Sequence, residues 1–329
     1  MKTISIFNQK GGVGKTTSVV NLAVALSKLD KKVLVIDFDP QANTTTGLGF
    51  DKNELEKSIY KMFYDEGDNY KDYILKSEEG PYLIASENSL SGLEVELVSL
   101  DEEERLKMLS QIIEEIEKDF DIILIDCPPS LGLLSLNALV ASDSIIIPIQ
   151  TEYYALEGVS ELLKTYQTIK ESIKEDLEIE GVLLCMFDKD TDLSYEVVEE
   201  VKSFFKEKVF STMIPRNIKL AEAPSFGKSV ISYDEKSKGA RAYLSLGNEL
   251  VENIFGKKEK NSKIEEKNDK LNNAEIKNLE KTKEIRDEKS KEDKNIVKND
   301  KKENSDETIV KKNKFSFNQN KLINNEKRD

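Results

Sequence analysis

The stretch that decides the fold is Lys10-Gly11-Gly12-Val13-Gly14-Lys15-Thr16-Thr17. It stands between an apolar segment, residues 3–8, and a helical pattern over residues 15–29. Glycines in such a turn allow backbone N–H groups to approach phosphate oxygens closely, and the positive end of the following helix adds to the attraction. We therefore expect a strand, a phosphate-binding loop and a helix. The alternative is a chance glycine-rich turn, which the strand–turn–helix context disfavours.

The general phosphate-loop pattern G-x-x-x-x-G-K-[ST] fails at one position, because Gln9 stands where its first glycine belongs and Lys10 follows. The form found here is the deviant Walker A motif. By the chemistry of the pattern, Lys15 contacts the β- and γ-phosphates and the hydroxyl of Thr16 ligates Mg²⁺. The residues of the loop predicted to bind nucleotide are Gly11, Gly12, Val13, Gly14, Lys15, Thr16 and Thr17.

Apolar runs and amphipathic segments alternate up to residue 256. Strands are expected at residues 3–8, 33–36, 122–125, 144–149 and 181–186. Helices are expected at 15–29, after the capping pair Asp101 and Glu104, around 162–173, near 194–206 and at 243–255. This alternation predicts an α/β protein, a three-layer α/β/α fold with a mostly parallel central sheet.

Charge divides the chain unevenly. Its 329 residues carry a formal net charge of −14, yet residues 1–256 hold 27 basic and 46 acidic side chains, and residues 257–329 hold 22 and 17. We predict one α/β domain over 1–256 and a charged, disordered tail over 257–329, because so polar a segment buries too little apolar surface to fold. A weak electrostatic tether for nucleic acid is the alternative role of the tail.

Missing residue types exclude several chemistries. The chain has no His, which excludes Ser-His-Asp and Cys-His catalysis and His-ligated metals. Its two cysteines, Cys127 and Cys185, cannot build a disulfide framework, so we expect a cytoplasmic protein. The sequence contains no run of 18 apolar residues, so no transmembrane helix is expected.

Four motifs together resemble the ParA/MinD class of ATPases, and more closely the ParA/Soj partition proteins. The first is the deviant Walker A motif. The second is Asp37-Phe38-Asp39-Pro40-Gln41-Ala42-Asn43, and the third is Ile125-Asp126-Cys127-Pro128-Pro129-Ser130. The fourth is Ile214-Pro215-Arg216-Asn217, followed by Ala221-Glu222-Ala223-Pro224-Ser225-Phe226-Gly227-Lys228. The resemblance spans residues 1 to about 256 and implies a P-loop NTPase that slowly hydrolyses ATP, with Mg²⁺ as a cofactor and a partner that stimulates it.

Three aspartates at strand ends are candidates for the site. Asp126 follows an apolar strand, where a carboxylate suits Mg²⁺ or its water shell; a loop cap is the alternative. Asp37 and Asp39 lie two residues apart, so we expect one of them to face the γ-phosphate. The resemblance implies that Asp39 orients the attacking water and that Asp37 supports the site near Mg²⁺. For Asp37, a structural cap is the alternative.

Lys10 is the residue that distinguishes this class from other P-loop enzymes. By resemblance it reaches across a nucleotide-sandwich homodimer to the partner's phosphates, and it is catalytic together with Lys15 and Asp39. An exposed lysine without such a role is the alternative. Pro215 and Asn217 are carried over from the family as contacts of the adenine.

DNA binding is predicted from one basic segment. Residues 202–241 contain nine basic and four acidic side chains within the acidic domain. The resemblance makes them a face for non-specific DNA, with Lys219, Lys228 and Arg216 as contacts; a set of solvated lysines is the alternative. Family members usually carry Arg where this chain has Asp190 and Lys219, and the first change reverses a charge.

The function predicted from the sequence is an ATP-hydrolysing partition protein that dimerises on ATP. We expect it to bind DNA, to lie on the nucleoid and to act with a ParB-type partner in chromosome or plasmid segregation. A MinD-like ATPase that cycles on a membrane is the alternative. It requires an amphipathic helix with a basic face, whereas the helix at 243–255 is acidic, so no membrane partner is expected.

Overall fold

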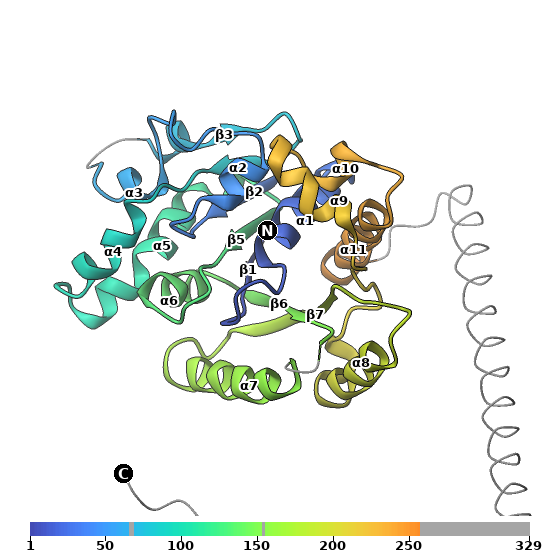
Figure 1. Ribbon diagram of the computed structural model, residues 1–329. Coiled ribbons are helices and arrows are strands. Elements are labelled where there is room, and N and C mark those ends of the chain that lie inside the picture. The colour runs from blue at the N-terminus through green and yellow to red at the C-terminus, as the bar shows by residue number, and fades with distance from the viewer. Residues whose placement is uncertain (66–68, 153–154, 257–329) are drawn as a thin grey trace, which may run out of the picture. The chain divides into compact units, whose positions relative to one another are not determined.

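A seven-stranded sheet forms the centre of the part of the chain that the computed structural model describes, residues 1–65, 69–152 and 155–256 (Figure 1). The strand order is β3-β4-β2-β5-β1-β6-β7. All neighbours pair in parallel except β3 and β4. The strands are β1 (Lys2–Ile6), β2 (Val33–Asp37), β3 (Leu75–Lys76), β4 (Tyr82–Ile84), β5 (Ile122–Asp126), β6 (Ser144–Gln150) and β7 (Glu178–Cys185).

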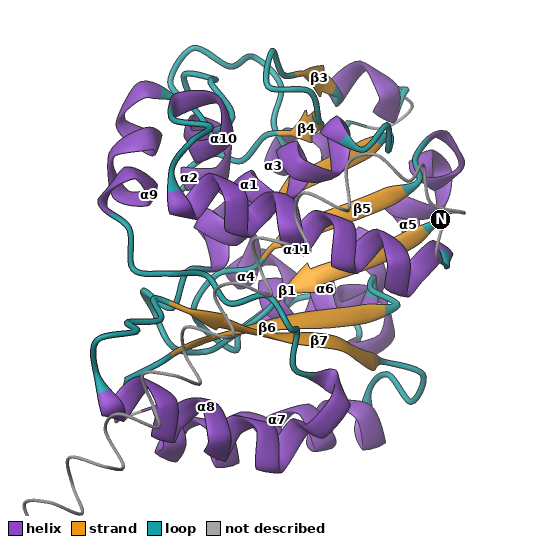
Figure 2. Ribbon diagram, turned by 90° about the vertical axis from the view of Figure 1, so that its right-hand side faces the viewer, coloured by secondary structure: helices purple, strands orange, loops and turns teal. Residues whose placement is uncertain are grey.

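Helices cover both faces of this sheet (Figure 2). One apolar cluster joins the sheet to the first and the last two helices, and a second joins it to the helices in the middle of the chain. The helices are α1 (Lys15–Lys28), α2 (Asn43–Gly47), α3 (Ile59–Met62), α4 (Leu90–Leu97), α5 (Glu102–Ile116), α6 (Leu133–Val140), α7 (Ala155–Ser172), α8 (Asp192–Phe205), α9 (Ile218–Glu222), α10 (Val230–Tyr233) and α11 (Lys238–Phe255). The predicted three-layer fold is confirmed.

Successive residues of the strands enter opposite clusters. Ile123 and Ile125 of β5 belong to the cluster on one face, while Ile122 and Leu124 belong to the other. This is why the strand is apolar throughout, as expected of a strand covered on both sides.

Five strands lie where the sequence predicts them, with ends that differ by a few residues. The predicted cap of α5 is also present, since the Asp101 side chain accepts hydrogen bonds from the backbone N–H groups of Glu103 and Glu104. The last helix begins at Lys238 rather than Tyr243, because the Ser237 side chain caps it by accepting from the N–H of Ala240.

The edge strand β3 and its neighbour β4 were not predicted, since two and three residues are too few for a pattern. α6 was missed as well, because its sequence, LLSLNALV, is apolar on nearly every side and has no helical period. Within the described residues, no helix is long and apolar enough to span a membrane. The tail predicted for residues 257–329 lies outside them and stays a prediction.

The sheet brings the predicted site together at one edge. β1, β2 and β5 are adjacent and parallel, and their last residues share one register: Asp126 is paired with Ile6 on one side and with Asp37 on the other. The glycine-rich loop leaves β1 at this edge, which is where ligands bind in parallel α/β sheets.

Candidate nucleotide site

The phosphate-binding loop owes its shape to two glycines. Gly12 and Gly14 have φ angles of 74° and 100°, the left-handed region that a side chain disfavours. Gly11 has no positive φ, and a Cβ atom built on Gly11 or Gly12 would meet nothing within 4 Å. The loop therefore offers open space on its outer side, which suits the approach of phosphate groups.

Asn8 fixes the entrance of this loop, and sequence reasoning missed it. Its side-chain amide donates to the carbonyl of Pro148 on β6 at 2.8 Å, and its Oδ1 accepts from the backbone N–H of Lys10 at 2.9 Å. The loop is thus tied to a neighbouring strand before its first glycine.

The two lysines of the motif have different surroundings. Lys15 is only 7% exposed, and its Nζ donates to the carbonyl of Lys10 at 3.2 Å. Burial lowers the pKa of Lys15, although the charge of Asp126 acts in the opposite direction. Lys10 is exposed, and its ammonium group makes no hydrogen bond or ion pair with any residue that the structure describes. Lys15 therefore points into its own loop, whereas Lys10 is available to another molecule.

One carboxylate oxygen of Asp126 accepts hydrogen bonds from two hydroxyl groups. Its Oδ2 accepts from Thr16 at 2.8 Å and from Thr44 at 2.7 Å. Its Oδ1 is buried and has no hydrogen-bond partner among the described residues. An unpartnered buried carboxylate oxygen beside the Thr16 hydroxyl fits a divalent cation, since oxygen ligands are those that Mg²⁺ prefers.

Asp37 is fully buried beside Asp126 on the adjacent strand. Its Oδ2 accepts from both the backbone N–H of Thr45 (2.7 Å) and its hydroxyl (2.6 Å), while Oδ1 accepts from the N–H of Asp39 (3.3 Å). These bonds match the structural-cap alternative, and a role near Mg²⁺ stays a prediction. Burial raises the pKa of both Asp37 and Asp126, and the charge of Asp126 adds to the effect at Asp37. A bound cation would offset both effects.

Asp39 lies at the rim of this cluster and is 8% exposed. Its Oδ1 accepts from the backbone N–H of Gln41 at 2.9 Å, which fixes the turn after β2. Its backbone carbonyl accepts from the hydroxyl of Ser86, the second residue after β4. Thr44, Thr45 and Ser86 were not predicted as site residues. The run of threonines after Asn43 was the one available signal, and nothing in the sequence indicates which acid each hydroxyl reaches.

The predicted adenine contacts lie beside the end of β7. Pro215 forms an isolated parallel bridge with Phe187, two residues beyond that strand. Asn217 caps α9, since its side-chain oxygen accepts from the N–H of Lys219 at 2.8 Å. The end of β7 also touches the loop, because a Cβ atom on Gly14 would stand 3.5 Å from the sulfur of Cys185. The contact of Pro215 and Asn217 with adenine stays a prediction.

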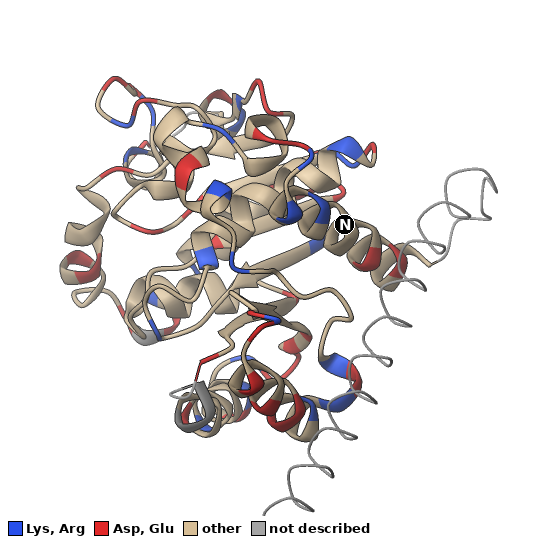
Figure 3. Cartoon of the chain, turned by 45° about the vertical axis from the view of Figure 1, so that its right-hand side comes forward, with Lys and Arg blue, Asp and Glu red and all other residues tan. Residues whose placement is uncertain are grey.

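Acidic partners accompany two of the three predicted DNA contacts. Arg216 pairs with Glu152 at 2.7 Å, and Lys219 pairs with Glu222 at 2.8 Å. Lys228 is exposed and has no ion pair in the described part of the chain. Figure 3 shows basic and acidic positions interspersed over the visible part of the chain. A net charge counted along the sequence therefore overstates how basic the segment is in space.

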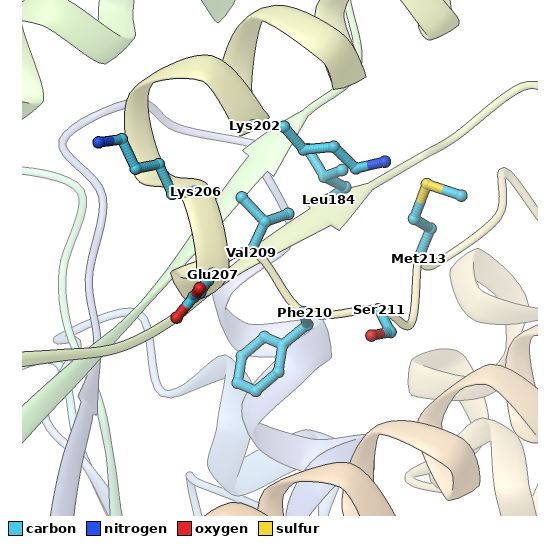
Figure 4. Close-up of a pocket in the computed structure, with 8 residues that line it drawn as sticks. All are labelled: Leu184, Lys202, Lys206, Glu207, Val209, Phe210, Ser211 and Met213. Carbon is cyan, nitrogen blue, oxygen red and sulfur yellow. The ribbon is translucent and has the colours of Figure 1, made fainter.

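A groove of about 550 Å³ lies away from this site, between the end of α8 and the segment 209–213. Figure 4 shows its lining residues, with Lys202 and Lys206 at the end of α8 and Phe210 and Met213 on the segment that follows. None of its lining residues belongs to the nucleotide motifs. The motif residues and not this groove define the candidate site.

At one edge of the sheet, the structure combines a loop with two glycines at positive φ, a buried lysine and a carboxylate at a strand end. This combination defines a P-loop nucleotide hydrolase of the deviant Walker A class. A family model described as an AAA domain matches residues 1–179. The chain is 49% identical to the sporulation initiation inhibitor protein Soj of Bacillus subtilis, covering 77% of this chain and 99% of that protein. It is 46% identical to the chromosome partitioning protein ParA of Myxococcus xanthus, covering 76% and 88%.

Among solved structures, the chain is similar to cobyrinic acid a,c-diamide synthase from Mycobacterium smegmatis with bound ADP and magnesium. The two are 32% identical with a TM-score of 0.66, over 76% of this chain and 94% of that one. The protein described here belongs to the ParA/Soj family of partitioning ATPases.

Proposed function

We propose that this protein is an ATP-driven switch for segregating chromosomes or plasmids. ATP joins two copies into a sandwich dimer, the dimer holds DNA without sequence preference, and a ParB-type partner stimulates hydrolysis. The observation that supports this scheme best is the contrast between two lysines in one loop. Lys15 is buried and turned to its own loop, while Lys10 is exposed and unpaired within the described residues.

ATP and Mg²⁺ are the proposed cofactors. The similar synthase structure was solved with ADP and magnesium. The relative from Bacillus subtilis is named Soj, and the relative from Myxococcus xanthus is named chromosome partitioning protein ParA. In this chain, Thr16 and the unpartnered oxygen of Asp126 would hold Mg²⁺ or its water shell. Such an ion would neutralise charge on the phosphates; the chain's own groups position the nucleotide and the water.

The proposed roles of the two lysines are supported by their burial and direction, and those of Asp39, Pro215 and Asn217 are carried over from the family. Lys15 and the backbone N–H groups of the glycine loop bind the phosphates of the same chain, and Lys10 serves those of the partner. Charge directed at developing negative oxygens is the main means of catalysing phosphoryl transfer. Asp39 would orient the attacking water, and Pro215 and Asn217 would contact the adenine.

The proposed partner and location come from the family, and the charge of the domain is compatible with such a partner. The domain of residues 1–256 carries 46 acidic against 27 basic side chains, which suits a basic segment on a ParB-type protein. DNA binding would place the ATP dimer on the nucleoid, in the cytoplasm.

The MinD-like alternative needs an apolar helix face free for a membrane, but Tyr243, Leu246 and Leu250 of α11 are buried in the core that includes α1.

One experiment tests the proposal: steady-state ATPase rates of the full chain with duplex DNA alone, with a ParB-type protein alone, and with both. We expect a low rate with either and a markedly higher rate with both. A rate that rises with vesicles of anionic lipid and not with DNA would support the MinD-like alternative instead. Equal rates in every mixture would contradict a partner-stimulated switch.

A further inference from the structure

The backbone of Asp39 is held by hydrogen bonds on both sides of its Cα atom. Its N–H donates to Oδ1 of Asp37 at 3.3 Å, and its carbonyl oxygen accepts from the hydroxyl of Ser86 at 2.8 Å. One holder lies two residues earlier in the chain, and the other lies 47 residues later. The direction in which the Asp39 side chain leaves the backbone is therefore fixed from two sides.

Thr45 joins these two holders. Its hydroxyl donates to Oδ2 of Asp37 at 2.6 Å and accepts from the backbone N–H of Ser86 at 3.0 Å. The result is a closed ring of hydrogen bonds that runs from Asp39 to Asp37, Thr45, Ser86 and back to Asp39. Asp37, Thr45 and Ser86 are all fully buried. Bonds that water cannot replace hold geometry firmly, because breaking one leaves a buried polar group unpaired.

The ring uses three separate parts of the fold. Asp37 ends β2, Thr45 belongs to α2, and Ser86 follows β4. Loops that carry a reacting group are otherwise free to move by an ångström, and a displacement of that size costs about 100-fold in rate. The ring removes this freedom at Asp39 while leaving its carboxylate at the rim of the site.

We infer that Thr45 and Ser86 are positioning residues for ATP hydrolysis, which act by holding Asp39 and do not touch the nucleotide. The inference rests on the proposed role of Asp39. It separates two properties that a binding residue would change together: the hydrolysis step depends on the ring, and the affinity for ATP depends on the glycine loop and Lys15.

The test compares kcat and ATP affinity in four variants of the full chain. Thr45→Val keeps the shape of the side chain and removes its hydroxyl, whereas Thr45→Ser keeps the hydroxyl. Ser86→Ala removes the second hydroxyl. Ser77→Ala is the matched control, because Ser77 is also buried and its hydroxyl also donates to a backbone carbonyl, that of Leu48, at 2.8 Å.

We expect single-turnover hydrolysis to fall about 10- to 100-fold in Thr45→Val and Ser86→Ala. ATP affinity by calorimetry should change less than about twofold, and Thr45→Ser should restore most of the rate. Ser77→Ala should lower the melting temperature without lowering kcat. Ser86→Ala is the smaller change and decides the matter if Thr45→Val does not fold.

Other outcomes overturn the inference in distinguishable ways. Parent kcat in Ser86→Ala and Thr45→Val, with Asp39→Ala inactive, would remove the positioning role and leave Asp39 in place. Equal losses of kcat in Ser86→Ala and Ser77→Ala would make the ring merely structural. A parent rate in Asp39→Ala would refute the proposed role of Asp39, and the inference with it.

Discussion

The nucleotide edge of the sheet and the basic segment at 202–241 represent two kinds of site in one domain. At the edge, Asp37, Asp126 and Lys15 are buried, and each has hydrogen-bond partners fixed by the fold. In the segment, Arg216 and Lys219 stand at the surface, each paired with a carboxylate. The partner of Arg216 lies 64 residues away in the sequence.

The difference concerns what a motif specifies. A buried motif fixes spacing, backbone conformation and neighbours together, because its polar groups must be satisfied inside the protein. A count of surface lysines specifies charge alone, and acids from other elements can cancel it at short range. Predictions at the edge therefore involve large effects, and those in the segment involve small ones that depend on salt.

Replacing Lys15 should have the largest effect. Lys15→Ala removes the buried ammonium group that we propose binds the phosphates, so ATP affinity should fall about 100-fold or more, in line with the loss of charge-assisted hydrogen bonds. Calorimetry with ATP and Mg²⁺ measures it. Lys28→Ala, in the last turn of the same helix, is the control and should bind as the parent does. Unchanged affinity in Lys15→Ala would refute the assignment of the loop.

Replacing Asp39 should stop turnover and leave binding intact. Asp39→Ala should bind ATP and dimerise, with hydrolysis reduced about 100-fold or more because the attacking water is no longer oriented. The matched control is Asp51→Ala, since the Asp51 carboxylate also accepts from the N–H two residues later, at 2.9 Å. A parent rate in Asp39→Ala would transfer the role to Asp37.

Lys10 and Gly11 should affect pairing and not binding. Lys10→Ala should bind ATP without dimerising or hydrolysing it. Gly11→Val should behave alike, because its Cβ meets nothing in the free chain but would obstruct a facing subunit. Light scattering with a non-hydrolysable ATP analogue is the measurement. Gly12→Val is the contrast: its φ of 74° is strained for valine, so the loop itself should fail to bind. Normal dimers of both pairing variants would exclude a lysine acting in trans.

The smallest expected effect is on DNA. Glu222 holds Lys219 at 2.8 Å, so Glu222→Gln should free a positive charge and tighten DNA binding by the ATP dimer, while Lys219→Glu should weaken it. The slope of log affinity against log salt should change by about one per contact. Lys107→Glu on α5 is the control, since Lys107 is likewise paired with a glutamate of its own helix. Salt slopes that are equal in all three variants would place the DNA contacts elsewhere.

The elements predicted from sequence are those with a strong local signal. The five long strands and the loop between β1 and α1 carry continuous apolar runs or a fixed spacing of glycines. The placement of Asp37, Asp39 and Asp126 near one another could be predicted, because Asp37 and Asp126 end strands and Asp39 follows one, all within recognisable motifs; their roles stay predictions. Asn8, Thr45 and Ser86 could not, because each acts through a contact with a residue on another element, and a single polar residue in a sequence does not indicate its partner.

The two threonines at the start of α2 fix the number of residues in the connection between β2 and α2. Consecutive residues of this short helix serve acids on neighbouring strands, Thr44 reaching Asp126 and Thr45 reaching Asp37. One residue advances a helix by about 100° and 1.5 Å, so an insertion or deletion between residues 40 and 44 would turn both hydroxyls away at once. The connection from β2 to α2 therefore tolerates changes of side chain at its exposed positions and no change in the number of residues.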